Sequence, residues 1–201
     1  MNKKYKNLFK DTIIFALGNL GSKVILFFLV PLYTNYLSTD EYGIADLVFT
    51  TSQLIVPFVS IVIYEAVVRY GLMQGQNPAQ TLKVGVYVGT IGSIITILLT
   101  PLLSFYKAIS PWKWYLCIYI ILNVNANTMM SYLKVKDRNR SYAIISIFRT
   151  FIMAILSVIL IAFVHTGVKG YLIANIVAMF SFINVAMSVA TQRYISYAMG
   201  T

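Results

Sequence analysis

Six long apolar stretches, separated by short polar connections, fill almost the whole chain of 201 residues. A helix needs about 20 mostly apolar residues to cross roughly 30 Å of hydrocarbon, and each stretch is long enough. The runs are continuous, whereas the strands of a membrane barrel would alternate apolar and polar residues. We therefore predict an all-α membrane protein, a six-transmembrane-helix bundle that forms one membrane lobe over residues 1–201. The expected spans are residues 11–37, 43–67, 82–105, 112–133, 141–164 and 170–191.

The composition favours a membrane protein over a soluble one. Hydrophobic residues make up 59% of the chain and charged residues only 11%, whereas a soluble domain carries about 25% charged residues. The net charge is +10, but the basic residues lie in short connections between apolar runs, so no nucleic-acid partner is expected. Cys117 and His165 are the only cysteine and the only histidine. A single cysteine and a single histidine, with no second ligand near the histidine, do not make a metal site, so we expect no metal and no cofactor.

The basic residues also predict the orientation of the spans. Short connections on the cytoplasmic side of a membrane protein are enriched in lysine and arginine. The connections on one side of the expected spans contain three basic residues, Lys107, Lys113 and Lys169, and those on the opposite side, together with the termini, contain eleven. The positive-inside rule therefore places both termini in the cytoplasm. The basic residues on the side assigned to the cytoplasm are Lys3, Lys4, Lys6, Lys10, Arg69, Lys83, Lys134, Lys136, Arg138, Arg140 and Arg193.

Prolines fall inside three of the expected spans, namely Pro31, Pro57 and Pro101. A proline in a membrane helix removes one backbone hydrogen bond, and neighbouring groups can compensate for that loss. We expect these prolines to kink their helices rather than to end them.

Two cationic side chains lie at bilayer depth, where a charge is costly unless it meets a partner or water. Lys23 is roughly 16 Å into the first span at 1.5 Å per residue. Asn19 lies one turn earlier on the same face. We predict that Lys23 faces a cavity, because a lysine stem is too short to bring the charge fully to the interface; snorkelling is the alternative. Arg149 in the fifth span is a second candidate, although partial snorkelling remains open for it.

Further polar residues qualify as candidates with weaker support. Asn123 and Asn127 share one face of the fourth span, either as contacts that hold helices together or as the wall of a polar cavity. Glu65 and Arg69 are four residues apart at the end of the second span, a spacing that predicts a structural ion pair. Small residues in the third span predict close helix packing, at Gly85, Gly89 and Gly92.

No catalytic motif is found along the chain. A phosphate-binding glycine loop, a nucleophile elbow and paired histidines are all missing from the sequence. Acidic residues do not cluster in the way that would hold magnesium for chemistry on lipid phosphates. We therefore expect a protein that is not an enzyme.

The first seventy residues resemble the N-terminal region of a bacterial protein family. The resemblance begins with Gly18-Asn19-Leu20-Gly21-Ser22-Lys23 and continues with Pro31-Leu32-Tyr33-Thr34. It then includes Leu37-Ser38-Thr39-Asp40-Glu41-Tyr42-Gly43 and ends with Glu65-Ala66-Val67-Val68-Arg69-Tyr70. This succession is similar to the polysaccharide biosynthesis proteins, which are lipid-linked oligosaccharide flippases of the multidrug/oligosaccharidyl-lipid/polysaccharide exporter superfamily.

The resemblance implies a transporter of two six-helix lobes in the bacterial cytoplasmic membrane. It would carry an undecaprenyl-linked oligosaccharide to the outer leaflet for surface polysaccharide synthesis, with cations such as Lys23 meeting the pyrophosphate. Expected partners are membrane lipids, the lipid-linked oligosaccharide, and a missing second lobe or polysaccharide-assembly proteins. The family has about twice as many helices, so we expect a fragment that contains the N-terminal lobe.

Two other functions stay open at this point. A drug or metabolite cation antiporter of the same superfamily would want acidic residues deep in a span, whereas the deep charges here are cationic. A membrane assembly subunit that does not transport would tolerate neutralisation of Lys23 with no effect beyond stability.

Overall fold

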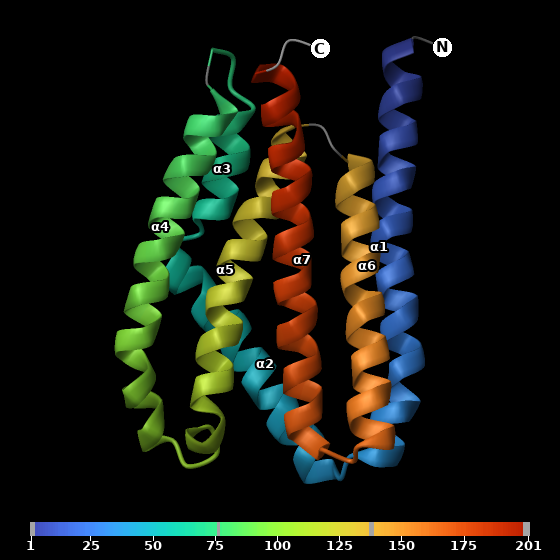
Figure 1. Ribbon diagram of the computed structural model, residues 1–201, viewed down its shortest axis with the longest axis vertical. Coiled ribbons are helices and arrows are strands. Elements are labelled where there is room, and N and C mark those ends of the chain that lie inside the picture. The colour runs from blue at the N-terminus through green and yellow to red at the C-terminus, as the bar shows by residue number, and fades with distance from the viewer. Residues whose placement is uncertain (1–2, 76, 137–138, 199–201) are drawn as a thin grey trace.

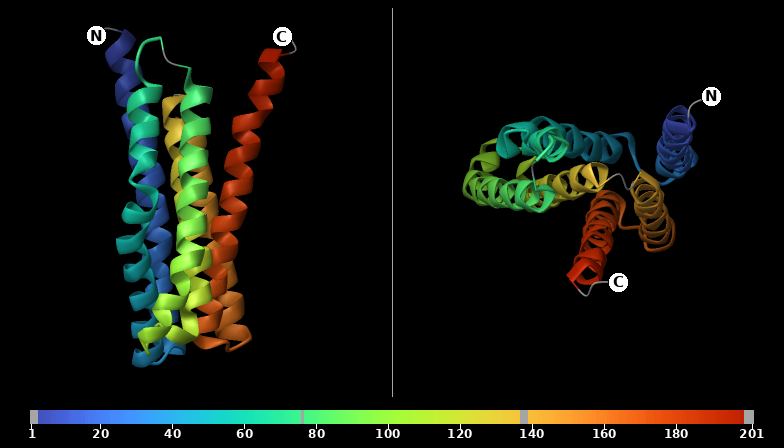
Figure 2. Two further views of the ribbon diagram at one scale, coloured as in Figure 1. Left: turned by 90° about the vertical axis from the view of Figure 1, so that its left-hand side faces the viewer. Right: turned by 90° about the horizontal axis from the view of Figure 1, so that it is seen from above.

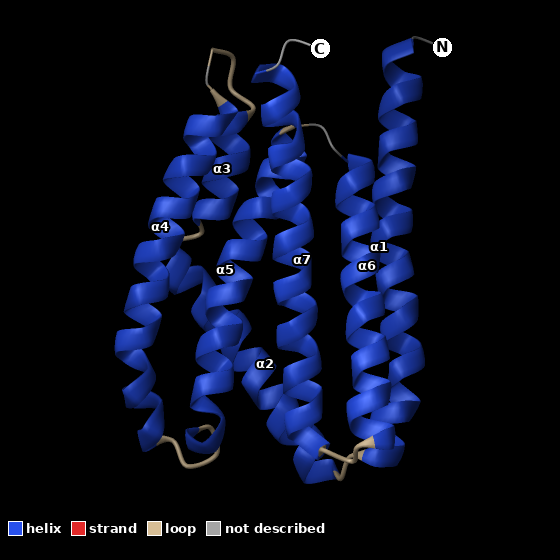
Figure 3. Cartoon of the chain, viewed as in Figure 1, coloured by secondary structure: helices blue, strands red, loops and turns tan. Residues whose placement is uncertain are grey.

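The computed structural model describes the backbone of residues 3–75, 77–136 and 139–198, and side chains mostly between residues 20 and 189. Within these residues every regular element is a helix (Figure 3). Three short segments of tighter or wider helix adjoin the α-helices: η1 (Thr100–Phe105), η2 (Ser110–Trp112) and the π-helical η3 (Val158–Phe163). The α-helices are α1 (Lys3–Tyr36), α2 (Thr39–Ser60), α3 (Ile63–Gly71), α4 (Pro78–Leu99), α5 (Lys113–Val135), α6 (Asn139–Ser157) and α7 (Gly167–Ala198).

The structure is that of an all-α, multi-pass membrane protein. Five helical stretches of the described residues are long and apolar enough to cross a membrane. Four of them match the third to sixth expected spans to within four residues, whereas the second expected span, residues 43–67, is matched only as far as Ser60. The first expected span, residues 11–37, lies on α1, several of whose side chains fall outside the described residues, and α1 is not among the five. The five stretches are Thr39–Ser60, Pro78–Phe105, Ser110–Val135, Arg140–Phe163 and Gly167–Val189.

The helices form two groups joined by α7 (Figure 1). α1 packs against α6 at one side of the bundle, whereas α2, α3, α4 and α5 pack together at the other. α7 contacts both α5 and α6, and the view from above shows it between the two groups (Figure 2). The two groups are therefore held together mainly through α7.

α2 begins at a capping box formed by Ser38 and Glu41. The Glu41 backbone N–H donates to the Ser38 hydroxyl at 3.2 Å, and the Ser38 N–H donates to the Glu41 carboxylate at 2.9 Å. These two bonds satisfy backbone donors that the first turn of a helix leaves free. The Leu-Ser-x-x-Glu segment of the sequence is therefore a helix start signal.

Replacing Ser38 with alanine is expected to lower the free energy of unfolding by about 1 kcal/mol, because the N-cap acceptor is lost. Thermal unfolding of the purified protein in detergent measures this change. Thr39→Ala is the matched control, since no capping bond involves the Thr39 side chain. Equal melting temperatures for Ser38→Ala and the unaltered protein would contradict the capping role.

The second expected span, residues 43–67, is not one continuous helix, which corrects the prediction of a simple kink at Pro57. α2 ends at Ser60, one turn after Pro57, and α3 starts at Ile63. Between them Ile61 and Val62 are both left-handed, with φ of 49° and 51°. β-Branched residues rarely adopt positive φ, because the side chain crowds the backbone.

The other two prolines have different outcomes. Pro31 lies inside α1, as expected. Pro101 does not lie inside a continuous α-helix, because α4 ends at Leu99 and the chain tightens into η1 at Thr100. A proline ring clashes with the carbonyl four residues earlier in an α-helix, and a 3₁₀ turn that begins at the proline avoids this clash.

The predicted small-residue stripe of α4 is confirmed as a packing surface. Gly85, Gly89 and Gly92 are all buried. A Cβ atom at Gly85 would lie 2.6 Å from the Val67 side chain of α3, and one at Gly92 would overlap the Val59 carbonyl oxygen of α2. The absence of side chains therefore allows α4 to approach α2 and α3 closely.

Candidate functional site

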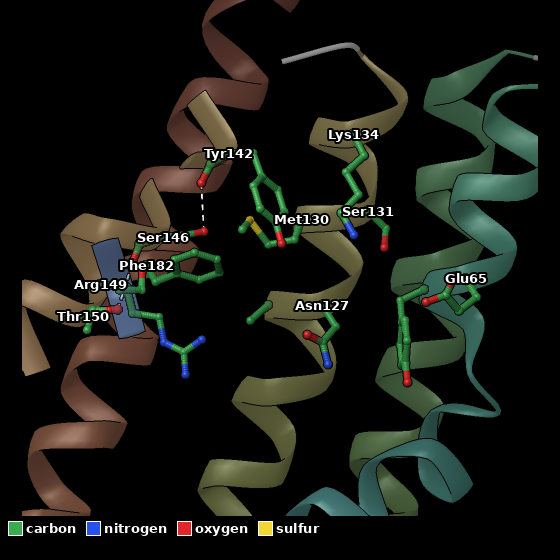
Figure 4. A pocket seen from close by; sticks show the side chains of 13 residues that line it. Glu65, Asn127, Met130, Ser131, Lys134, Tyr142, Ser146, Arg149, Thr150 and Phe182 are labelled. Carbon is green, nitrogen blue, oxygen red and sulfur yellow. Dashed lines mark hydrogen bonds between the residues drawn. The ribbon is translucent and has the colours of Figure 1, made fainter. Parts of the chain in front are cut away.

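A cavity of about 480 Å³ opens between the two helix groups. It lies toward the end of the bundle where α5 connects to α6, and five helices contribute to its wall (Figure 4). Among the lining residues are two cations and one carboxylate. The lining residues are Ser22, Tyr64, Glu65, Ala126, Asn127, Met130, Ser131, Lys134, Tyr142, Ser146, Arg149, Thr150 and Phe182.

Arg149 supplies the deeper cation of the cavity. It is nine residues after Arg140, so it lies about 14 Å along α6 from the start of the Arg140–Phe163 stretch. Its guanidinium carbon is 5.5 Å from the centre of the Phe182 ring of α7, and its side chain projects into the cavity (Figure 4). A guanidinium that packs on an aromatic face keeps the N–H donors at its edge available for a carboxylate or phosphate.

Lys134 supplies the second cation, nearer the mouth of the cavity. Its ammonium nitrogen lies 5.3 Å from the centre of the Tyr142 ring. The contact joins the end of α5 to the first turn of α6, across the connection between these helices. Lys134 and Arg149 therefore stand at two depths of one cavity.

The hydroxyl groups of Ser146 and Thr150 on α6 can act as hydrogen-bond acceptors in the cavity, but their own protons are already donated. The Ser146 hydroxyl donates to the Tyr142 carbonyl at 2.8 Å, and the Thr150 hydroxyl donates to the Ser146 carbonyl at 3.0 Å. Their protons are thus occupied within the helix, as is common for serine and threonine in membrane helices. The hydroxyls of Ser146 and Thr150 therefore offer no donor to an anion in the cavity.

The two asparagines of α5 share one face, as predicted. The Asn127 amide donates to the Asn123 side-chain oxygen at 2.8 Å. The bond lies within one helix, so it does not itself hold two helices together. Asn127 lines the cavity, whereas Asn123 is not among the lining residues. The polar cavity wall is thus the better description for Asn127.

Glu65 faces the cavity from α3, on the wall opposite Arg149 (Figure 4). Arg69 lies one turn later, in the last turn of α3, and both side chains are exposed. Among the interactions of the described side chains, no hydrogen bond or ion pair joins Glu65 to Arg69. The structural ion pair stays a prediction, and in the structure Glu65 is a lining residue of the cavity.

The structure does not bring Lys23 together with Arg149. Lys23 is exposed, and its neighbour Ser22 lines the cavity instead. The side chain of Asn19 lies outside the described residues. Successive residues of a helix point about 100° apart, so the face that α1 turns toward α6 directs Ser22 rather than Lys23 into this cavity.

From the sequence, Lys134 was expected in a connection, and Tyr64 and Tyr142 were not identified as candidate site residues. A signal for most of the cavity was nevertheless present in the spacing of polar residues. Asn127, Ser131 and Lys134 are separated by four and three residues along α5. Tyr142, Ser146 and Arg149 repeat this spacing along α6, and residues so spaced share one face of a helix.

Comparison with known proteins gives one distant similarity to report. The chain is 27% identical over 195 residues to a Haemophilus influenzae protein named "Lsg locus putative protein 1". The aligned region covers 93% of this chain and 47% of the relative, so the chain spans about half the relative's length. The relative's name states a locus and no activity. No protein-family model and no solved structure matches the chain.

Proposed function

We propose that this chain is the first lobe of a flippase that moves undecaprenyl-linked oligosaccharides across the bacterial cytoplasmic membrane. In this proposal α1 is a further span beside the five apolar stretches, which gives six crossings with both termini in the cytoplasm. The cavity then opens toward the cytoplasm, where lipid-linked oligosaccharides are assembled. The lobe acts by binding and alternating access, without catalysis.

The observation that carries this proposal is the position of Arg149 in the cavity. A guanidinium at this depth, packed on Phe182 and followed toward the mouth by Lys134, is an arrangement that attracts an anion. Arginine forms two parallel hydrogen bonds to a phosphate group, which gives direction as well as charge. The pyrophosphate of a lipid-linked sugar is an anion that would meet these cations at the inner leaflet.

The length relation to the Haemophilus influenzae protein is compatible with the proposal. The relative is about twice as long as this chain, and a two-lobe exporter has that proportion. A second lobe would also cover polar groups that one lobe alone exposes at bilayer depth, which is costly in lipid.

A cation antiporter of the same superfamily is the second candidate, and Glu65 is the residue that favours it. A carboxylate that lines a membrane cavity can bind a proton, a sodium ion or a cationic substrate. The lining residues nevertheless carry two cations against this one carboxylate, so their balance favours an anion. A membrane assembly subunit is the third candidate, and no described contact specifically favours it.

Deletion of the native gene separates the three candidates. The flippase proposal expects loss of a surface polysaccharide together with accumulation of its lipid-linked precursor. If the chain belongs to an antiporter, the deleted cells are expected to be more sensitive to cationic compounds, while their surface polysaccharide is unchanged. If the chain is a non-transporting subunit, deletion is expected to disrupt a complex of partner proteins. A transport-inactive variant of this protein is then expected to restore that complex.

Neutralising Lys23 tests the first sequence-based candidate. If Lys23 meets the substrate, Lys23→Ala in the native gene is expected to reduce polysaccharide export at least about tenfold, because one charged contact contributes roughly 1.5–3 kcal/mol. Lys23→Arg keeps the charge and is expected to retain export. Export and precursor are measured at matched amounts of protein in the membrane. Normal export by Lys23→Ala would remove Lys23 from the substrate path.

A further inference from the structure

Three polar residues of α2 form a stripe on its exposed surface. Asp46, Thr50 and Gln53 are separated by four and three residues, so they share one helix face, and all three side chains are exposed. At 1.5 Å per residue, they lie about 10, 16 and 21 Å from the Thr39 end of a stretch that can cross the membrane. Thr50 is therefore close to the middle of the bilayer.

Two other exposed polar residues within membrane-crossing stretches satisfy their donors within their own helix. The Thr90 hydroxyl of α4 donates to the Val86 carbonyl at 2.8 Å. The Asn184 amide of α7 donates to the Phe180 carbonyl at 2.8 Å. Such groups tolerate a lipid surface, because their hydrogen bonds are already made.

The α2 stripe differs in this respect. Among the hydrogen bonds of the described side chains, none involves Asp46, Thr50 or Gln53. A carboxylate, a hydroxyl and a primary amide without partners are unfavourable in hydrocarbon. These side chains therefore need water or another polar group beside them.

The surroundings of Phe49 place the stripe in the molecule. Phe49 lies three residues after Asp46 and four before Gln53, and its ring packs against Tyr119 and Tyr171 at 4.9 and 5.4 Å. Tyr171 in turn packs against Tyr33 at 4.8 Å. The stripe thus borders an aromatic cluster formed by helices of both groups.

We propose that Asp46, Thr50 and Gln53 face water and form the part of the path through this lobe that runs from the outer side past the middle of the bilayer. The cavity around Arg149 would be the part of the path nearer the cytoplasm. The assignment of a path rests on the proposed transport function, whereas the contact of the stripe with water does not. The substrate class that such neutral and acidic groups suit is the sugar portion, whose hydroxyls both donate and accept hydrogen bonds.

Cysteine labelling in intact cells tests this proposal. Thr50→Cys and Gln53→Cys are made in the native gene with Cys117, the chain's only cysteine, replaced by alanine. The probe is a membrane-impermeant thiol-reactive reagent added outside the cells. Because reaction requires the thiolate, which forms in water and not in hydrocarbon, a hydrated position reacts faster. Phe58→Cys of α2 and Ile94→Cys of α4 are matched controls at exposed apolar positions.

Labelling at positions 50 and 53 is expected to be at least tenfold faster than at positions 58 and 94. Equally slow labelling at all four positions would overturn the proposal, because the stripe would then face lipid. Reaction at 50 and 53 with a permeant reagent only would overturn the outer part of the proposal, since the stripe would then be reached from the cytoplasm alone. If the stripe is labelled but gene deletion leaves polysaccharide export intact, the flippase function fails and the hydrated stripe stands.

Discussion

Replacement of Arg149 with alanine is expected to weaken the binding of undecaprenyl pyrophosphate by ten- to about 150-fold. The estimate is the loss of charge-assisted hydrogen bonds worth about 1.5–3 kcal/mol, with each 1.4 kcal/mol equal to a factor of ten. The guanidinium packs on Phe182 and projects into the cavity, so no large rearrangement is needed for it to meet an anion. Purified protein in lipid nanodiscs that contain the labelled lipid provides the measurement.

Two further variants sharpen the Arg149 experiment. Arg149→Lys keeps the positive charge but loses the paired donors, so an intermediate affinity is expected. Arg140→Ala removes a cation from the start of the same helix, outside the cavity lining, and is expected to leave binding within about twofold. If Arg140→Ala and Arg149→Ala weaken binding equally, the interaction is a general attraction to a basic surface, and the cavity assignment is wrong.

Introducing a methyl group at Gly92 is expected to destabilise the bundle by about 1–3 kcal/mol. A Cβ atom at this position would overlap the carbonyl oxygen of Val59, which belongs to the backbone just before the break between α2 and α3. A backbone carbonyl cannot turn away as a flexible side chain can, so α4 must shift away from α2. Melting of the purified Gly92→Ala protein in detergent measures the loss, as a fall of several degrees.

Gly89→Ala is the matched control for Gly92→Ala. Its Cβ atom would lie 3.4 Å from a methyl group of Val124, which is ordinary van der Waals contact. Alanine also favours a helix over glycine by up to about 1 kcal/mol. The Gly89→Ala protein is therefore expected to match or exceed the melting temperature of the unaltered protein. Equal destabilisation by both variants would show that any added methyl group on this face of α4 disturbs the bundle, and that contact with Val59 is not the cause.

Much of the fold was predictable because the relevant signals are local. The length of an apolar run is set by the thickness of the bilayer, so the stretches that form α4, α5 and α7 were located from hydropathy alone. The start of α2 was present in the order Ser38-x-x-Glu41, because a capping box involves residues within one turn. Gly85, Gly89 and Gly92 indicated a packing face before any partner helix was known.

The break between α2 and α3 was not predictable in the same way. Ile61 and Val62 are β-branched, and their left-handed backbone is unfavourable locally. It persists where packing on both sides over-determines it: Val67 of α3 is buried beside Gly85, and Gly92 lies against Val59. Contacts between helices, and not local preference, decided this feature.

The membership of the candidate site was likewise decided by tertiary structure. The sequence by itself determined that Lys23 and Arg149 are cations within expected spans, and that Asn127 and Arg149 lie on polar faces of their helices. It did not determine how each helix is rotated about its axis within the bundle. The packing of α1 against α6 exposes Lys23, and the packing of α5 and α7 beside α6 puts Lys134 and Phe182 around Arg149. Depth along a helix follows from counting residues, whereas the direction of a side chain follows from what the helix packs against.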